Sequence, residues 1–95
     1  MYETIQDRFN AFHASNPIVY KELVRLATDM KNKGHNKIGI RMLWEVMRWN
    51  ILMKVVTISD DYKLNDHFTS RYVRLITANE PLLKDVFELR ELRAQ

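Results

Sequence analysis

The stretch "KIGIRMLWEVMRWNILM" (residues 37–53) decides the fold, because it holds two tryptophans, three methionines and a row of cations but few neutral polar residues. At about 100° per residue, Lys37, Arg41, Trp44 and Arg48 fall inside an arc of roughly 60° on a helix. Apolar residues dominate every other direction. A helix that is apolar nearly all round must be enclosed by its neighbours. The pattern therefore predicts a central helix over about 38–53, whose solvent-exposed face is cationic.

Composition predicts a single helical domain over residues 1–95. The chain has 95 residues, of which 46% are apolar and 28% charged, and this is typical of a soluble globule with a real core. Cysteine is absent, which excludes disulfides and thiolate sites and fits a reducing compartment. The N-terminal "MYETIQDRFN" carries acids, so it is not a secretory signal, and no apolar run is long enough to cross a membrane. We expect a cytoplasmic protein that does not enter membranes.

Two helices are expected before the central one. Ile5, Phe9 and Phe12 fall at i, i+4 and i+7, which predicts a first short helix. In the second, over about 17–33, Asn16 is expected as the N-cap and Pro17 as the first helical residue. Gly34 is expected to end this helix in a left-handed conformation. Its inward residues are expected to be Ile18, Val19, Leu23, Leu26, Ala27 and Met30.

The segment after the central helix has a different character. "KVVTISDDYKLN" (54–65) places β-branched and aromatic residues on both sides of the polar turn "SDD". This predicts a short β-hairpin near residues 55–64, with Val56, Ile58, Tyr62 and Leu64 on one face. Alternatively, Val55 and Val56 could simply end the central helix.

Two further helices complete the predicted order. Asn65 or Asp66 can cap a fourth helix that ends near Asn79, and Pro81 can begin a fifth. The expected inward residues are Phe68, Tyr72, Leu75 and Ile76 in the fourth helix, and Leu82, Leu83, Val86, Phe87 and Leu89 in the fifth. The fold class is thus mainly α, a compact bundle of about five helices. A helix pair joined by a tight turn and followed by a hairpin favours a winged helix-turn-helix.

The net charge and its distribution permit a polyanionic partner without requiring one. Net charge is +3, and residues 37–74 hold seven Lys or Arg against four acids, which accounts for nearly all of the surplus. A second cationic row, formed by His67, Arg71 and Arg74, follows the i, i+4, i+7 spacing of a helix face. Guanidinium groups could meet phosphates or guanine edges, and Trp44 could stack on a base. The candidate nucleic-acid-binding residues are Lys37, Arg41, Trp44, Arg48, Lys54, Lys63, His67, Arg71 and Arg74.

A simpler reading of the same residues needs no ligand. Every soluble helix has a solvated face, and Arg41 with Glu45 makes an ordinary i, i+4 pair. The long cationic side chains could cover apolar surface, and Trp44 could be half-buried packing. The methionines of the central helix, Met42, Met47 and Met53, are either adaptable core filler or part of a soft groove that binds a partner.

Motifs for other chemistries are absent from the sequence. His13, His35 and His67 are widely separated and lack metal-ligand spacing, so no metal is expected. Asp60 and Asp61 suit a turn better than a catalytic pair. There is no glycine-rich phosphate loop, nucleophile elbow or H-E-x-x-H motif. We therefore expect neither an enzyme nor a cofactor.

The end of the chain, "PLLKDVFELRELRAQ" (81–95), offers a possible oligomer contact. Leu82, Val86, Leu89 and Leu92 lie near heptad spacing. This would suit a homodimer seam along the C-terminal helix, although a helix of this length more often docks onto its own domain.

Three segments of the chain resemble a family of small proteins from tailed phages and prophages. They are "RFNAFHASNPIVYKELVRLA" (8–27), matching F-x-x-F-H-x-x-N-P-x-V-Y, then "GIRMLWEVMRWN" (39–50) and "YKLNDHFTSRYVRLI" (62–76). The resemblance implies a phage origin and action inside an infected bacterium, and it brings no activity to carry over. At the third segment the family commonly has Asn where this chain has Asp66, which makes contact with a polyanion less favourable.

Two functions are compatible with these patterns. In the first, the protein is a small DNA-binding protein, regulatory or accessory to DNA processing, that uses the basic faces of the third and fourth helices. In the second, it is an effector that binds and inhibits a host enzyme or a defence complex through protein–protein contacts. DNA and a host protein are thus the two candidate partners.

Overall fold

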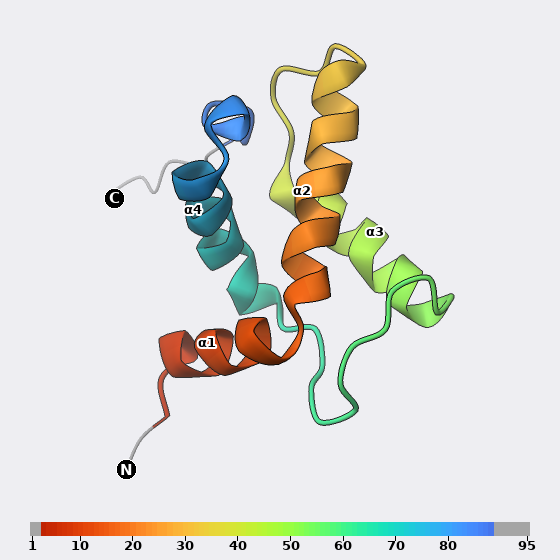
Figure 1. Ribbon diagram of the computed structural model, residues 1–95, viewed down its shortest axis with the longest axis vertical. Coiled ribbons are helices and arrows are strands. Elements are labelled where there is room, and N and C mark those ends of the chain that lie inside the picture. Colours follow the sequence, from red (N-terminus) through yellow and green to blue (C-terminus); the bar gives the residue numbers. More distant parts are fainter. Residues whose placement is uncertain (1–2, 89–95) are drawn as a thin grey trace, which may run out of the picture.

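The computed structural model describes residues 3–88 of the chain. These residues form four α-helices and two short 3-10 helices, which are joined by loops (Figure 1). The α-helices are α1 (Ile5–Ser15), α2 (Pro17–Asn32), α3 (Ile40–Leu52) and α4 (Thr69–Asn79). The 3-10 helix η1 (Asp66–Phe68) precedes α4, and η2 (Pro81–Leu83) follows it. The mainly helical class is therefore confirmed.

Capping groups explain where the first two helices begin and end. Thr4 caps α1 in a capping box, in which its hydroxyl accepts from the Asp7 N–H and the Asp7 carboxylate accepts from the Thr4 N–H. Gly34, with φ +98°, ends α2 as predicted. Its N–H donates to Lys31 O and the His35 N–H donates to Met30 O, as in a Schellman motif. The predicted bounds of the second helix are confirmed to within one residue.

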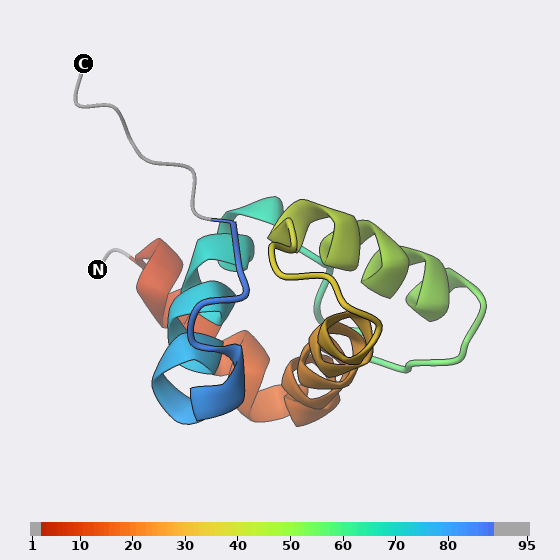
Figure 2. The ribbon, with the colours of Figure 1, turned by 90° about the horizontal axis from the view of Figure 1, so that it is seen from above.

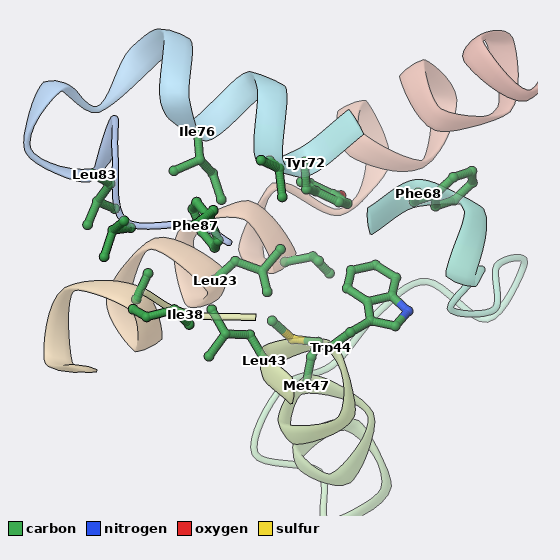
Figure 3. Packing of buried hydrophobic residues seen from close by; sticks show 14 of the residues in the cluster. Leu23, Ile38, Leu43, Trp44, Met47, Phe68, Tyr72, Ile76, Leu83 and Phe87 are labelled. Carbon is green, nitrogen blue, oxygen red and sulfur yellow. The ribbon is translucent and has the colours of Figure 1, made fainter. Parts of the chain in front are cut away.

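The hydrophobic core lies between the four helices, and Figure 3 shows part of it from close by. Most predicted inward residues are buried or half-buried, including Phe9 and Phe12 on α1 and Tyr72 and Ile76 on α4. Two predictions are wrong, because Ile18 is 41% exposed and Leu82 is 78% exposed. The fully buried side chains of largest volume are Trp44, Tyr72, Phe12, Leu23, Ile38, Leu43, Met47, Ile76 and Val19.

The segment between α3 and η1 forms an irregular loop, so the predicted hairpin over residues 55–64 is not formed. Its turn is where "SDD" placed it, since the Tyr62 N–H donates to Ser59 O at 3.0 Å. The two arms do not pair as strands, however, because their apolar side chains are drawn into the core. Val56 is buried, and the Tyr62 ring meets Phe12 edge-on at 5.6 Å. Without this wing, the winged helix-turn-helix prediction is not confirmed.

The predicted fifth helix is also not formed over residues 81–88. After η2 the chain turns and makes an isolated parallel bridge between Ile38 and Phe87. The Ile38 N–H donates to Val86 O at 2.7 Å, and the Glu88 N–H donates to Ile38 O at 2.9 Å. This extended pairing buries Val86 and Phe87 beside α3. Leu82 lies in the 3-10 helix η2 and Val86 in the turn after it, so these two members of the predicted homodimer seam do not share an α-helix. The other members, Leu89 and Leu92, lie outside the described residues.

A buried asparagine joins the loop to the corner between α1 and α2. Asn16 is the N-cap residue of α2, as predicted, but its side chain makes no capping hydrogen bond. Instead, its Oδ1 accepts from the Ser59 N–H at 2.7 Å, and its Nδ2 donates to Phe12 O at 3.2 Å. The amide is 3% exposed, so these two bonds replace its contacts with water. Asn16 therefore fixes the loop against the helices.

Replacing Asn16 with Ala should lower the free energy of unfolding by about 1–3 kcal/mol, because Ser59 N–H loses its acceptor in a partly buried place. Chemical denaturation measures the change. Asn10 on α1 is the matched control, since its amide is exposed and, among residues 3–88, its side chain bonds to Gln6 alone. Asn10→Ala should change stability by less than about 0.5 kcal/mol. Equal effects of the two substitutions would contradict the role given to Asn16.

Candidate interaction face on α3

Trp44 sets the rotation of α3 about its own axis. The side chain is 1% exposed, and its ring lies on the core side of the helix near Tyr72, with ring centroids 5.7 Å apart (Figure 3). Its Nε1–H donates to Asp66 Oδ1 at 3.1 Å, so the indole is buried without losing its hydrogen bond. Leu43 and Met47 are buried on the same side. The prediction that Trp44 stacks on a base is thus wrong, because the ring is packed inside the protein.

This rotation turns an apolar row outward. Met42, Val46, Trp49 and Met53 follow the i, i+4, i+7, i+11 spacing and share an arc of roughly 60°. Their exposed fractions are 48%, 36%, 61% and 52%. We call these four residues the α3 stripe. Figure 2 shows α3 at the edge of the molecule, where the described part of the chain leaves its outer side uncovered. The prediction that neighbours enclose this helix is therefore wrong.

The exposed apolar residues are concentrated at one part of the surface. Leu52, 66% exposed, and Val55, 70% exposed, extend the α3 stripe at its C-terminal end. Six of the eight exposed large apolar residues between residues 3 and 88 therefore gather on α3 and just after it, and soluble monomers rarely expose apolar residues in such a group unless it is a binding site.

Several members of the predicted cationic face are engaged within the chain. Arg48 donates to Glu45 at 2.8 Å and to Asp66 at 2.6 Å. Lys37 donates to the Asp85 carbonyl at 3.2 Å. Arg71 donates to Gln6 of α1 at 3.0 Å and to the His67 carbonyl. The cationic row on α3 therefore contacts η1 through Arg48, whereas Arg71 of the second cationic row contacts α1.

The remaining predicted cations are exposed and scattered. Arg41 lies near the start of α3, Lys54 just after its end, Lys63 in the loop, and Arg74 on α4. His67 is exposed on η1. Among residues 3–88, none of the four Lys and Arg forms an ion pair. These residues could contact a nucleic acid, but no interaction among residues 3–88 joins them into one continuous row.

Lys54 is held in a strained conformation at the end of α3. Its φ is +63°, the left-handed region in which glycine is usual. The Lys54 N–H donates to Ile51 O and the Val55 N–H to Asn50 O, which reproduces the Schellman pattern with lysine in the glycine position. A non-glycine residue in this region costs about 1–2 kcal/mol. The geometry thus places a cation directly beside the C-terminal end of the α3 stripe.

A groove of about 550 Å³ lies next to the α3 stripe, between the C-terminal half of α3 and the loop. Its apolar lining comes from Ile51, Leu52, Val56, Ile58, Tyr62 and Leu64, and its charged lining from Arg48, Lys54, Lys63 and Asp60. Leu52 belongs to both the groove and the exposed apolar face. The face and the groove are therefore continuous.

Other kinds of site find no support in the described residues. A second hollow, of about 670 Å³, mixes opposite charges, with Arg8, Lys63 and His67 beside Glu3, Asp61 and Asp66. Within residues 3–88, no three His, Asp or Glu side chains are grouped as a metal site would require. No helix in the same range combines the length and apolarity needed to cross a bilayer.

The sequence prediction considered Met42 and Met53 for a partner-binding groove, but it missed Val46 and Trp49 and the row that the four residues form. Their signal was present, since their spacing is as regular as that of the cationic row. Both rows were compatible with an outward face. The contacts of Trp44 with Tyr72 and Asp66 decide between them.

Comparisons with known proteins give no relative from which to assign this face. No family model matches the chain, and neither a curated protein nor a solved structure matches it significantly. The resemblance to phage proteins thus stays a prediction.

The contacts of Asp66 predict a specific pH dependence. The Arg48 guanidinium, assisted by the Trp44 N–H, holds the pKa of Asp66 below its ordinary value of 3.8. A carboxyl whose pKa is lower in the folded state stabilises the fold above its unfolded pKa and loses this effect as pH falls through its folded pKa. Asp66→Asn should therefore be destabilising at neutral pH, and the difference from the wild type should shrink below about pH 4. Denaturation at a series of pH values measures this.

Asp60→Asn removes the same charge from an exposed loop position and is the control. NMR titration gives an independent readout, in which Arg48→Gln should raise the pKa of Asp66. An unchanged pKa in that variant would show that the ion pair does not hold Asp66.

Proposed function

We propose that this protein acts by binding another protein chain through the exposed apolar face of α3. One observation carries the proposal: Met42, Val46, Trp49 and Met53 stand outward in a row on a helix whose opposite side is packed into the core. Apolar residues that are exposed together in this way mark interaction sites in soluble proteins. The resemblance to phage proteins supports a host protein as the partner, such as an enzyme or a defence complex inside an infected bacterium.

Trp49 is the expected anchor of the interaction. It is the largest side chain of the α3 stripe and lies between Val46 and Met53, with 61% of its surface exposed. Tryptophans near the centre of an interface contribute a disproportionate share of binding energy. Methionines adapt their shape to a partner surface, which suits Met42 and Met53 at the two ends.

DNA binding is the second candidate, and the exposed cations Arg41, Lys54, Lys63 and Arg74 favour it. It has less geometric support than protein binding for two reasons. Trp44 is buried, and Arg48 is shared between two carboxylates. A phosphate would have to compete with Glu45 and Asp66 for that guanidinium, and these acids would also repel it.

A capture experiment with the full-length protein tests the proposal. The tagged protein is mixed with nuclease-treated lysate of the bacterial host, and a stoichiometric protein partner is expected to remain bound. Val46→Asp combined with Trp49→Asp should abolish this capture, because charges would replace the centre of the apolar face. Both positions are exposed or nearly so, so each substitution should cost less than about 1 kcal/mol of stability.

Thr28→Asp provides the control, since it adds an acid at an exposed position on α2. Undiminished capture by the Val46/Trp49 variant would contradict the proposal. If capture instead depends on nucleic acid, DNA binding is measured at several salt concentrations. Arg41→Ala with Arg48→Ala should then weaken affinity and flatten the dependence of log K on log salt.

A further inference from the structure

The spacing of the α3 stripe is symmetrical along the helix. Its four residues are separated by four, three and four positions. The midpoint between Met42 and Met53 is therefore also the midpoint between Val46 and Trp49. Spacings that alternate between three and four residues are those of a coiled-coil seam, along which one helix packs against another. A second α3 can thus run antiparallel along the stripe with all four side chains in register.

The sizes of the side chains favour the antiparallel direction. In an antiparallel pair about this midpoint, Trp49 of each copy lies opposite Val46 of the other, so the largest side chain of the row meets the smallest at two places. Met42 lies opposite Met53, and methionine adapts its shape to its neighbours. Large side chains opposite small ones fill a contact evenly. In a parallel pair, by contrast, the two Trp49 rings would oppose each other, and the two Val46 side chains would leave a gap.

The polar residues that border the α3 stripe are paired within the chain. On one side of the stripe Glu45 is nearest, and Arg48 donates to its carboxylate at 2.8 Å. On the other side Asn50 is nearest, and its amide donates to Glu22 of α2 at 3.4 Å. Arg41 and Arg48 project roughly 110–130° away from the middle of the stripe. A second copy can therefore approach the stripe without bringing the cations of α3 face to face.

We infer that the free protein forms an antiparallel homodimer in which the α3 stripes of two copies pack against each other. Such a pair has twofold symmetry, and each copy contributes the same surface. It covers the row of apolar side chains that the described part of the chain leaves exposed at the edge of the molecule (Figure 2). Because one row of side chains per copy makes a small contact, the association is weak, and the monomer predominates in dilute solution.

The inference goes beyond the proposed function and does not rest on it. A second copy and a host protein would use the same four side chains, so each would exclude the other. Pairing would shield the apolar stripe in the free protein, and binding of a host partner would dissociate the pair by mass action. This contact is separate from the homodimer seam that the sequence predicted in the C-terminal segment.

Engineered cysteines test both the contact and its direction, because the chain contains no cysteine of its own. An antiparallel pair places position 42 of one copy opposite position 53 of the other, but it separates each position from its own counterpart by about 16 Å along the helices. A disulfide needs Cα atoms about 4.4–6.8 Å apart. With oxidised glutathione, an equimolar mixture of the Met42→Cys and Met53→Cys variants should therefore form a cross-linked dimer, and neither variant alone should do so. Thr28→Cys, at an exposed position on α2, replaces Met42→Cys in the control mixture and should not cross-link.

Exchange of the two central side chains gives a second readout. Val46→Trp should weaken self-association at least about tenfold because two tryptophans would collide, and Trp49→Val should do so because two valines would leave a gap. An equimolar mixture of these two variants restores a tryptophan opposite a valine at both places, and it should associate about as tightly as the wild type. Sedimentation over a series of concentrations measures this. Leu82→Ala, at an apolar position exposed away from α3, should leave the association unchanged.

A wild-type protein that stays monomeric up to about 1 mM would overturn the inference. Cross-linking of Met42→Cys with itself would overturn the antiparallel direction, and equal cross-linking in the Thr28→Cys mixture would show chance collisions only. These outcomes are distinct from failure of the proposed function, which is shown when the Val46/Trp49 variant captures its partner as well as the wild type does. A stripe-dependent host partner together with a strictly monomeric protein would retain the function and reject the homodimer.

Discussion

Burial of the Trp44 indole is the constraint on which the rest of the structure depends. Its ring packs near Tyr72 of α4, and its N–H reaches Asp66 of η1, so one residue ties α3 to both elements. Because side chains three and four residues apart share a face, this contact also places Leu43 and Met47 inside. It therefore determines which residues of α3 face outward.

The same constraint changes the chemical character of the exposed surface. With Trp44 inside, the cationic row lies at the border of the buried face, and Arg48 there meets the carboxylates of Glu45 and Asp66. The apolar row of Met42, Val46, Trp49 and Met53 takes the outward position. The outward side of α3 is thus apolar, whereas the sequence suggested that its exposed face would be cationic. The strained Lys54 places a positive charge at the C-terminal end of this row.

Local signals in the sequence predicted the four α-helices well, because they depend on neighbouring residues, but they also predicted a fifth helix that is not formed over residues 81–88. Pro17 and Gly34 mark the ends of α2, and the spacing of Phe68, Tyr72 and Ile76 predicts the buried face of α4. The rotation of α3 could not be predicted, because apolar residues occupy nearly all of its directions and only tertiary contacts choose among them. The hairpin failed for a similar reason. Val56 and Tyr62 gain more by packing against the helices, where Asn16 holds their loop, than by pairing two short strands.

Solvent accessibility of the methionine methyl groups tests the orientation of α3 most directly. With methyl-labelled methionine, a soluble paramagnetic agent should strongly broaden the NMR signals of Met42 and Met53, which are 48% and 52% exposed. The Met47 signal should be nearly unaffected, because that side chain is fully buried. A protected Met42 together with a broadened Met47 would mean that α3 is rotated the other way, and the apolar interaction face would not exist.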